Sequence, residues 1–142
     1  MVNHNARIVA LDIGEKRIGV ASANVVARLA SPLQTIQVSE AVLQDITHIL
    51  SEQTAIALVI GLPRNLQSED TAQTKKVRDF GTKLKAEINL PIYWQDEALT
   101  SHVSKEKLKA TNKPYAKGDI DALAACQILE DYLSQNLQDA EI

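Results

Sequence analysis

Residues 7–21 of the chain read RIVALDIGEKRIGVA, and the rest of the sequence can be interpreted outward from this stretch. Residues 8–11 are apolar on both faces, which a β-strand tolerates only where its sheet is covered on both sides, so we place this strand centrally. Asp12 follows where the apolar run ends. Gly14 is expected to supply the positive-φ turn that returns residues 18–21 as an antiparallel partner. Asp12 is therefore predicted at the rim of the sheet.

A carboxylate at the end of a central strand suits metal or phosphate chemistry, because the sheet fixes its position while solvent and ligand still reach it. Asp shortly before Gly is also common in hairpin turns. Residues 12–14 alone do not decide between these two interpretations.

The longer string DIGEKRIGVA, which begins at Asp12, closely resembles the first motif of the YqgF family, the small RuvC-like proteins of the ribonuclease H-like superfamily. Three later stretches resemble further motifs of that family in the same order: residues 59–63 (VIGLP), 96–101 (DEALTS) and 117–125 (KGDIDALAA). With their connecting elements these motifs cover nearly the whole chain, and four ordered matches are far more specific than one.

The 142 residues fit one domain, residues 1–142, that is large enough to bury a core. The sequence has no apolar run that could span a bilayer, and its first residues lack the apolar region of a secretory signal, so we expect a cytoplasmic protein without a membrane partner. Cys126 is the only cysteine, which excludes an internal disulfide, and its apolar surroundings predict a small core residue.

The net charge of −3 argues weakly against a nucleic-acid partner, but the charges are unevenly distributed. Residues 71–117 contain ten basic residues and five acids, a local balance of +5. A basic stretch beside an acidic metal site is compatible with binding a phosphate backbone. A solvated lysine-rich surface explains the same composition, so charge alone does not settle the partner.

After the first hairpin, the alternation in residues 32–38 predicts a third strand and hence an antiparallel meander. Ser39 is expected to cap a helix with one apolar stripe. Residues 54–60 (TAIALVI) predict a fully buried strand, which the intervening helix returns parallel to the first strand.

Residues 68–70 are expected to begin a second helix with a basic exposed surface, and residues 91–95 to form a fifth strand. Asp119 is expected to cap a last, largely buried helix. The sequence thus predicts an α/β fold: a mixed five-stranded sheet, with a three-strand antiparallel meander plus two parallel strands, and helices on both faces. The resemblance implies the same ribonuclease H-like architecture.

Parallel strands end at the same edge of a sheet, so Asp96 and Glu97 are expected near Asp12. Asp121 stands in the first turn of the buried helix, where a charge is rarely tolerated unless it is paired or holds a metal; interaction with the helix dipole is the alternative. Carboxylates of this kind select Mg²⁺ or Mn²⁺, and a cluster can hold two ions about 3.5 to 4 Å apart for phosphoryl transfer. We find no zinc-site spacing, Ser-His-Asp arrangement or P-loop.

The resemblance carries the catalytic and metal-binding roles of the family to Asp12, Glu97 and Asp121. The candidate nucleic-acid-binding residues are Arg17, Arg64, Thr100, Lys105, Lys107 and Lys109.

The chain departs from the family pattern at several points. Ala98 stands where the family usually has Arg, and the loop near Gln67 lacks the usual Gly, which predicts altered substrate contacts. RuvC resolvases are expected to place an acid at the end of the fourth strand, where this chain reads GLP. Glu97 must therefore reach in from the fifth strand, about 10 Å from the first.

The resemblance implies a metal-dependent nuclease acting on structured nucleic acid, with the 5′ end of pre-16S rRNA as the expected substrate. Two alternatives stay open. A Holliday-junction resolvase would need a dimer that presents two sites to symmetric strands, and the sequence leaves monomer and homodimer equally open. A non-catalytic RNA-binding or transcription-associated factor would keep the fold with a weakened site.

Overall fold

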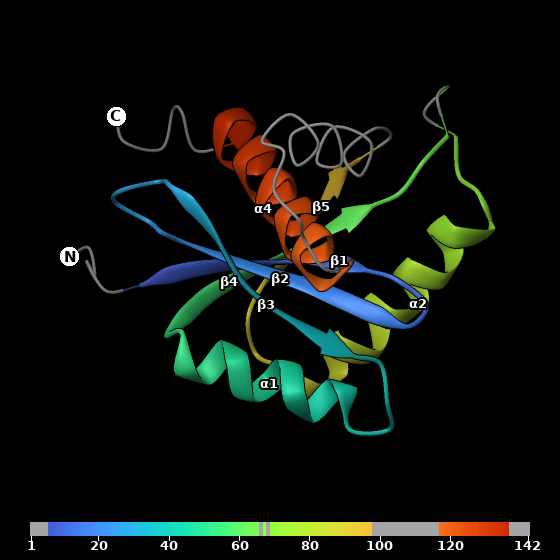
Figure 1. The fold of residues 1–142 in the computed structure, drawn as a ribbon, viewed down its shortest axis with the longest axis horizontal. Coiled ribbons are helices and arrows are strands. Elements are labelled where there is room, and N and C mark those ends of the chain that lie inside the picture. The colour runs from blue at the N-terminus through green and yellow to red at the C-terminus, as the bar shows by residue number, and fades with distance from the viewer. Residues whose placement is uncertain (1–5, 66, 68, 98–116, 137–142) are drawn as a thin grey trace.

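The computed structural model describes residues 6–65, 67, 69–97 and 117–136. Five strands form one mixed sheet in the order β3-β2-β1-β4-β5 (Figure 1). They are β1 (Arg7–Ile13), β2 (Arg17–Asn24), β3 (Ala30–Gln37), β4 (Ala55–Leu62) and β5 (Ile92–Asp96). β1, β4 and β5 run parallel, whereas β2 is antiparallel to both β1 and β3. The predicted meander with two added parallel strands is confirmed.

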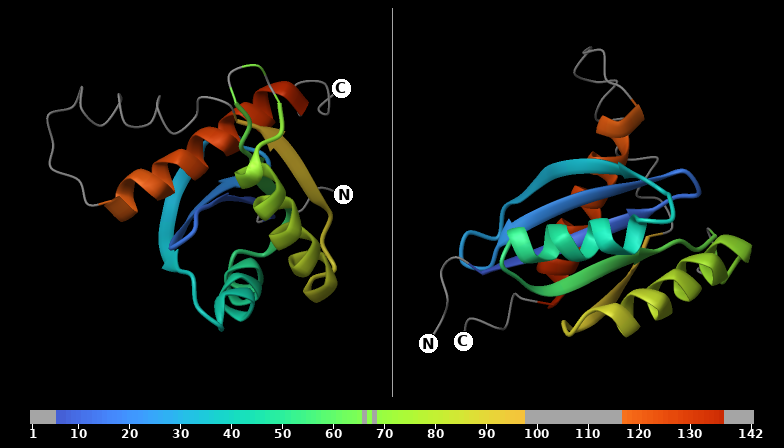
Figure 2. Two further views of the ribbon diagram at one scale, coloured as in Figure 1. Left: turned by 90° about the vertical axis from the view of Figure 1, so that its right-hand side faces the viewer. Right: turned by 90° about the horizontal axis from the view of Figure 1, so that it is seen from below.

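Three described helices cover the two faces of the sheet. α1 (Val42–Glu52) and α2 (Ala72–Glu87) lie on one face, and α4 (Lys117–Asn136) crosses the other, as Figure 2 shows. α1 and α2 are the crossovers that bring β4 and β5 back parallel to β1, which places both helices on the same side. Among the described residues, no helix is both long and apolar enough to cross a membrane.

The alternation of side chains along β1 and β4 divides the core into two layers. One layer packs under α1 and α2 and includes Val9, Leu11, Leu58 and Ile60 with Ile46, Leu50, Val77 and Leu84. The other packs under α4 and includes Ile8, Ala10, Ala57 and Val59 with Ala125, Cys126 and Leu129. Residues 8–11 of β1 and 57–60 of β4 are all apolar because both faces of the sheet are buried there. Cys126 is the core residue that its surroundings predict.

The first two helices begin later than expected. Ala41, not Ser39, precedes α1, because the Ser39 hydroxyl accepts a hydrogen bond from the Ala41 backbone N–H and forms a turn before the helix. α2 does not begin at residues 68–70. Thr71 caps it in a capping box, in which the Thr71 hydroxyl accepts from the Thr74 N–H and the Thr74 hydroxyl accepts from the Thr71 N–H.

The last helix begins earlier than expected, and the first hairpin turns differently. α4 starts at Lys117, so Asp119 lies inside it and Asp121 is its fifth residue. The expectation of a positive φ at Gly14 is wrong, since no glycine among the described residues has one. Gly14 is needed for a close approach instead, because a Cβ there would lie 2.7 Å from the Arg17 carbonyl oxygen.

Candidate active site

Asp12 lies on the α4 face of the sheet, where the parallel strands end. Ala10, two residues earlier, belongs to the layer under α4, and alternation carries Asp12 to the same face. The neighbouring strands carry glycines at this level. Gly19 of β2 pairs with Asp12, and Gly61 of β4 follows the residue that pairs with Leu11. Asp12 therefore has no Cβ beside it on either neighbouring strand.

Gly19 allows α4 to lie directly on the sheet at Asp121. A Cβ on Gly19 would lie 1.9 Å from the Asp121 carbonyl oxygen and 2.8 Å from the Ala122 nitrogen. This close approach brings the Asp121 carboxylate near Asp12. Burial, and then the negative charge of Asp121, raises the pKa of Asp12 to about 6.

Asp121 is paired with Arg17, the first residue of β2. The Arg17 Nε donates a hydrogen bond to the Asp121 Oδ2 at 2.6 Å. The Arg17 and Asp121 side chains are 32% and 24% exposed, so the ion pair lies at the protein surface. The helix dipole acts most strongly within the first turn of a helix. Asp121 is the fifth residue of α4 and so lies beyond that turn. Arg17 thus provides a positive charge in direct contact with Asp121.

Glu97 faces α4 from the end of β5, as do Tyr93 and Gln95 at alternate positions before it. The ring centroids of Tyr93 and Tyr132 are 5.6 Å apart, and the Gln95 side-chain amide donates to Gln135 of α4 at 3.1 Å. The same alternation turns Asp96 to the opposite face. Of the two adjacent acids, only Glu97 therefore shares a face with Asp12.

Glu97 lies beside Gly61 and bonds to Asp131 of α4. A Cβ on Gly61 would be 3.5 Å from the Glu97 Cγ. Burial raises the pKa of Glu97 to about 9, with further increases from the charge of Asp131, the hydrogen bond to it, and the charges of Asp12 and Asp96. The Glu97 Oε1 is buried without a hydrogen-bond partner among the described residues. Such an oxygen is stabilised by a proton or a cation.

Four carboxyl groups thus line the α4 face in two pairs, Asp12 with Asp121 and Glu97 with Asp131. Within the described parts of the chain, no three His, Cys, Asp or Glu side chains come close enough together to hold one metal ion. The donor chemistry fits a hard divalent cation, because every candidate ligand atom is a carboxyl oxygen. Burial, together with the neighbouring carboxylates, raises the pKa values of Asp12 and Glu97, so a cation beside them would favour their charged forms. Movement of the Glu97 side chain from Asp131 toward Asp12 would complete the set of three acids.

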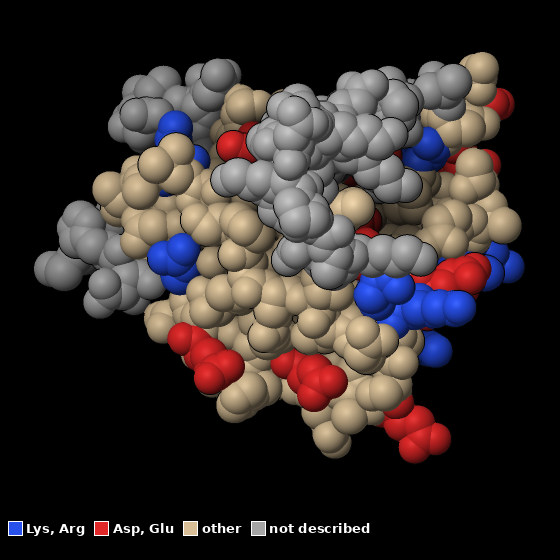
Figure 3. All heavy atoms as spheres, viewed as in Figure 1, with Lys and Arg blue, Asp and Glu red and all other residues tan. Residues whose placement is uncertain are grey.

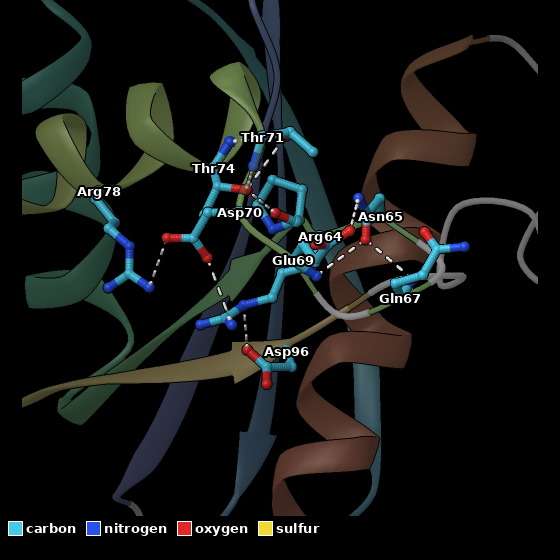
Figure 4. A network of polar contacts seen from close by, with 10 residues as sticks. Arg64, Asn65, Gln67, Glu69, Asp70, Thr71, Thr74, Arg78 and Asp96 are labelled. Atoms are coloured by element: carbon cyan, nitrogen blue, oxygen red, sulfur yellow. Dashed lines mark hydrogen bonds and ion pairs between the residues drawn. The ribbon is translucent and has the colours of Figure 1, made fainter.

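Arg64 belongs to an ion-pair network at the end of β5 (Figure 4). Its Nε lies 3.1 Å from the Asp96 Oδ1, and its Nη1 lies 3.4 Å from the Asp70 Oδ1. Asp70 in turn is 3.6 Å from the Arg78 Nη2 on α2. The network ties the loop after β4 to the end of β5 and to α2. The guanidinium of Arg64 already contacts two carboxylates, and its predicted contact with nucleic acid stays a prediction.

One of the exposed lysines of α2 contacts an acidic side chain. Lys75, Lys76, Lys83 and Lys85 are all exposed, as expected, and Lys76 contacts Glu15 of the β1–β2 turn at 3.1 Å. Figure 3 shows blue and red spheres adjoining where this turn and α2 lie. This part of the surface is mixed in charge rather than uniformly basic.

The comparisons with known proteins show the family and the fold of the chain. A family model described as RuvX: Holliday junction resolvase matches residues 6–135. The chain belongs to the RuvX family. It is 39% identical over 132 residues to a protein from Fusobacterium nucleatum that carries the name "Putative pre-16S rRNA nuclease", covering 89% of this chain and 96% of that protein. A protein of the same name from Gloeothece citriformis is 34% identical over 129 residues, covering 88% and 85% of the two chains.

The fold of this RuvX-family chain is also similar to that of RuvC. The structure of Thermus thermophilus RuvC in complex with a Holliday junction substrate aligns with a TM-score of 0.56 at 14% identity, covering 92% of this chain and 95% of that one. The resemblance drawn from the four motifs is therefore confirmed for family and fold.

Sequence reasoning singled out some residues of the candidate site in this RuvX-family chain and missed others. Thr100, Lys105, Lys107 and Lys109 lie outside the described residues, as does Ala98. Gly19 and Gly61 were not predicted, although a glycine inside an apolar strand indicates a close approach and could have drawn attention to both. Asp131 gave no such signal, because in the sequence it is one of several acids near the C-terminus.

Proposed function

We propose that this chain is a divalent-metal-dependent nuclease that hydrolyses phosphodiester bonds of structured RNA and processes the 5′ end of pre-16S rRNA in the cytoplasm. The observation that carries the proposal is the placement of Asp12, Glu97 and Asp121 on one face, where the parallel strands end and α4 crosses them. The RNA substrate is inferred from the name that the relatives share.

In this proposal Asp12, Glu97 and Asp121 are the catalytic metal ligands, and the ion is Mg²⁺ or Mn²⁺. A bound divalent cation would activate water and stabilise the leaving oxygen of the phosphodiester. β1 and its flanking glycines hold Asp12, and contact with Gly19 holds Asp121 beside it. Glu97 follows β5, and its side chain supplies the third carboxylate.

The protonation of the acids links the site to pH. Because burial raises the pKa values of Asp12 and Glu97, both carboxyl groups bind protons more tightly than ordinary acids do. Ligands must be deprotonated to hold a cation, so metal affinity should increase as pH rises toward the pKa of Glu97.

A second candidate function is cleavage of Holliday junctions, which the description of the matching family favours. Resolution of a junction requires two symmetric cuts, and so a homodimer with two sites. The third candidate, a non-catalytic RNA-binding or transcription-associated factor, requires only the fold and a surface that binds nucleic acid.

One cleavage assay separates these candidates. The purified protein would be incubated with RNA spanning the 5′ end of pre-16S rRNA, with an unrelated RNA duplex and with a four-way DNA junction, in Mg²⁺, Mn²⁺ or EDTA. We expect cleavage of the precursor RNA only, and only with metal. Asp12→Asn should abolish cleavage, whereas Asp45→Asn, an exposed acid on α1, should leave it unchanged.

Other outcomes would reassign the protein. Cleavage of the junction in preference to the precursor would favour the resolvase. Tight RNA binding without cleavage of any substrate would favour the binding factor.

A further inference from the structure

The ion pair between Arg17 and Asp121 uses the carboxylate that the proposed metal site also needs. The Arg17 Nε lies 2.6 Å from the Asp121 Oδ2, a short charge-assisted contact. Side chains alternate between the two faces along β2, and Arg17 lies two residues before Gly19, so Arg17 faces α4. The positive charge of Arg17 thus stands beside the same acids that a divalent cation would bind.

A guanidinium and a divalent cation repel each other at such short range. A cation bound by Asp12 and Asp121 would add two positive charges next to Arg17, and their repulsion weakens the ion pair. The ion pair is also accessible, because both side chains are a quarter to a third exposed. Ion pairs near the surface contribute little net stability, so this one can exchange its partner at low cost.

The position of Arg17 suits a second acceptor. Arg17 begins β2 directly after the β1–β2 turn, where its carbonyl oxygen accepts a hydrogen bond from the Gly14 N–H at 3.0 Å. The backbone is thereby fixed at the rim of the sheet while the long side chain can swing. Arginine is well suited to bind phosphate, because its N–H groups can form paired hydrogen bonds with phosphate oxygens.

We propose that Arg17 is exchanged between Asp121 and the phosphate of the bound nucleic acid, so that binding of a divalent cation at Asp121 releases Arg17 and strengthens substrate binding. This inference rests on the proposed function, because it assumes that Asp121 holds metal. Arg17 takes the place of the cation at Asp121 before the metal binds and contacts substrate afterwards. Metal and nucleic acid then bind cooperatively, and by thermodynamic linkage each raises the affinity of the other.

A permanent brace is the opposing explanation. A carboxylate has two oxygens, so Arg17 could hold the Asp121 Oδ2 while the other oxygen binds metal, as outer partners of metal ligands often do. The two explanations predict opposite effects of removing Arg17. Loss of a competitor tightens metal binding, whereas loss of a brace weakens it.

The first test is a calorimetric titration of Mn²⁺ into the protein in the absence of nucleic acid. Arg17→Gln should bind Mn²⁺ at least about fivefold more tightly than the parent, the lower end of ordinary coupling between sites. Arg17→Lys keeps the charge, so its Mn²⁺ affinity should lie between those of the parent and Arg17→Gln. It serves as a second variant if Arg17→Gln folds poorly. The matched control is Arg7→Gln, because the Arg7 Nε donates to Ser22 at 3.3 Å and Arg7 begins β1, away from the acids.

The second test measures binding of a short RNA duplex in EDTA and in Ca²⁺, with a gel to show that the RNA stays intact. The parent and Arg7→Gln should gain affinity on addition of Ca²⁺. Arg17→Gln should gain at least about fivefold less, since it has no guanidinium to release.

The outcomes distinguish the exchange from the proposed function. Equal or weaker Mn²⁺ binding by Arg17→Gln, with normal binding by the parent, would overturn the exchange and leave the metal-dependent nuclease standing. An equal gain of RNA affinity in both proteins would also overturn it. Absence of Mn²⁺ binding by the parent and both Arg17 variants would overturn the exchange and the proposed metal site together.

Discussion

Gly19 of β2 lies directly against the backbone of Asp121 in α4, so closely that the space for a Cβ is occupied by the Asp121 carbonyl group. The contact sets the height of α4 above the sheet at the point where Asp12 ends the central strand. A single glycine thus controls the distance between two of the proposed metal ligands.

Replacement of Gly19 by alanine should displace α4 and separate Asp121 from Asp12. Overpacking of this kind costs about 1 to 3 kcal/mol, to be measured by urea unfolding. The thermal stabilisation produced by Mn²⁺ should fall as well, because metal stabilises only a native state that binds it. Gln34→Ala, at an exposed position of the edge strand β3, should change neither quantity. A fully stable Gly19→Ala protein with normal metal response would show that α4 can shift without cost.

Glu97 should make the metal-free protein less stable as pH rises. The folded state holds its proton up to a pKa of about 9, whereas the unfolded chain loses it near 4.5, so folding takes up a proton between these values. The free energy of unfolding should therefore decrease with pH across this range, by at most about 1.4 kcal/mol per pH unit for one group. Asp12 contributes in the same direction between 3.8 and about 6.

Urea unfolding at several pH values in EDTA measures this dependence. Glu97→Gln should flatten it between neutral and alkaline pH, because the amide does not titrate. Glu40→Gln, at an exposed position, should retain the slope of the parent. An unchanged slope in Glu97→Gln would contradict the raised pKa.

Asp131 should hold Glu97 away from the other acids, so its removal should ease metal binding. Asp131→Ala takes away both the hydrogen bond and the negative charge that raise the pKa of Glu97. Mn²⁺ affinity should then reach its plateau at a lower pH than in the parent, as calorimetry at several pH values would show. Glu130→Ala, at the exposed neighbouring position, is the control. Weaker metal binding by Asp131→Ala would instead make Asp131 a supporting ligand.

Arg64→Ala should lower stability by about 1 kcal/mol, because it removes the centre of the network that joins Asp70 and Asp96. The effect is modest because both acids are more than half exposed. Lys76→Ala, which removes an exposed pair with Glu15, should cost no more than a few tenths of a kcal/mol. RNA affinity, measured alongside, decides whether Arg64 also contacts phosphate.

The sequence by itself determined the order of the strands and the rim position of Asp12. An apolar run with both faces buried identifies a central strand, and this pattern is local, so it can be read without knowing the partners of the strand. The sequence placed both Asp96 and Glu97 near Asp12, and only the contacts of β5 with α4 show that Glu97, rather than Asp96, faces that helix. The four motifs determined the family.

The pairing of the acids was decided only by the tertiary structure. Arg17 and Asp121 are 104 residues apart, and Glu97 and Asp131 come from different elements. The path of α4 across the sheet decides which of its residues contact each strand. Gly19, Gly61 and the side chains packed between the helix and the sheet set that path. Local patterns place each acid on a face, but only the close packing of distant segments determines which charge lies against which.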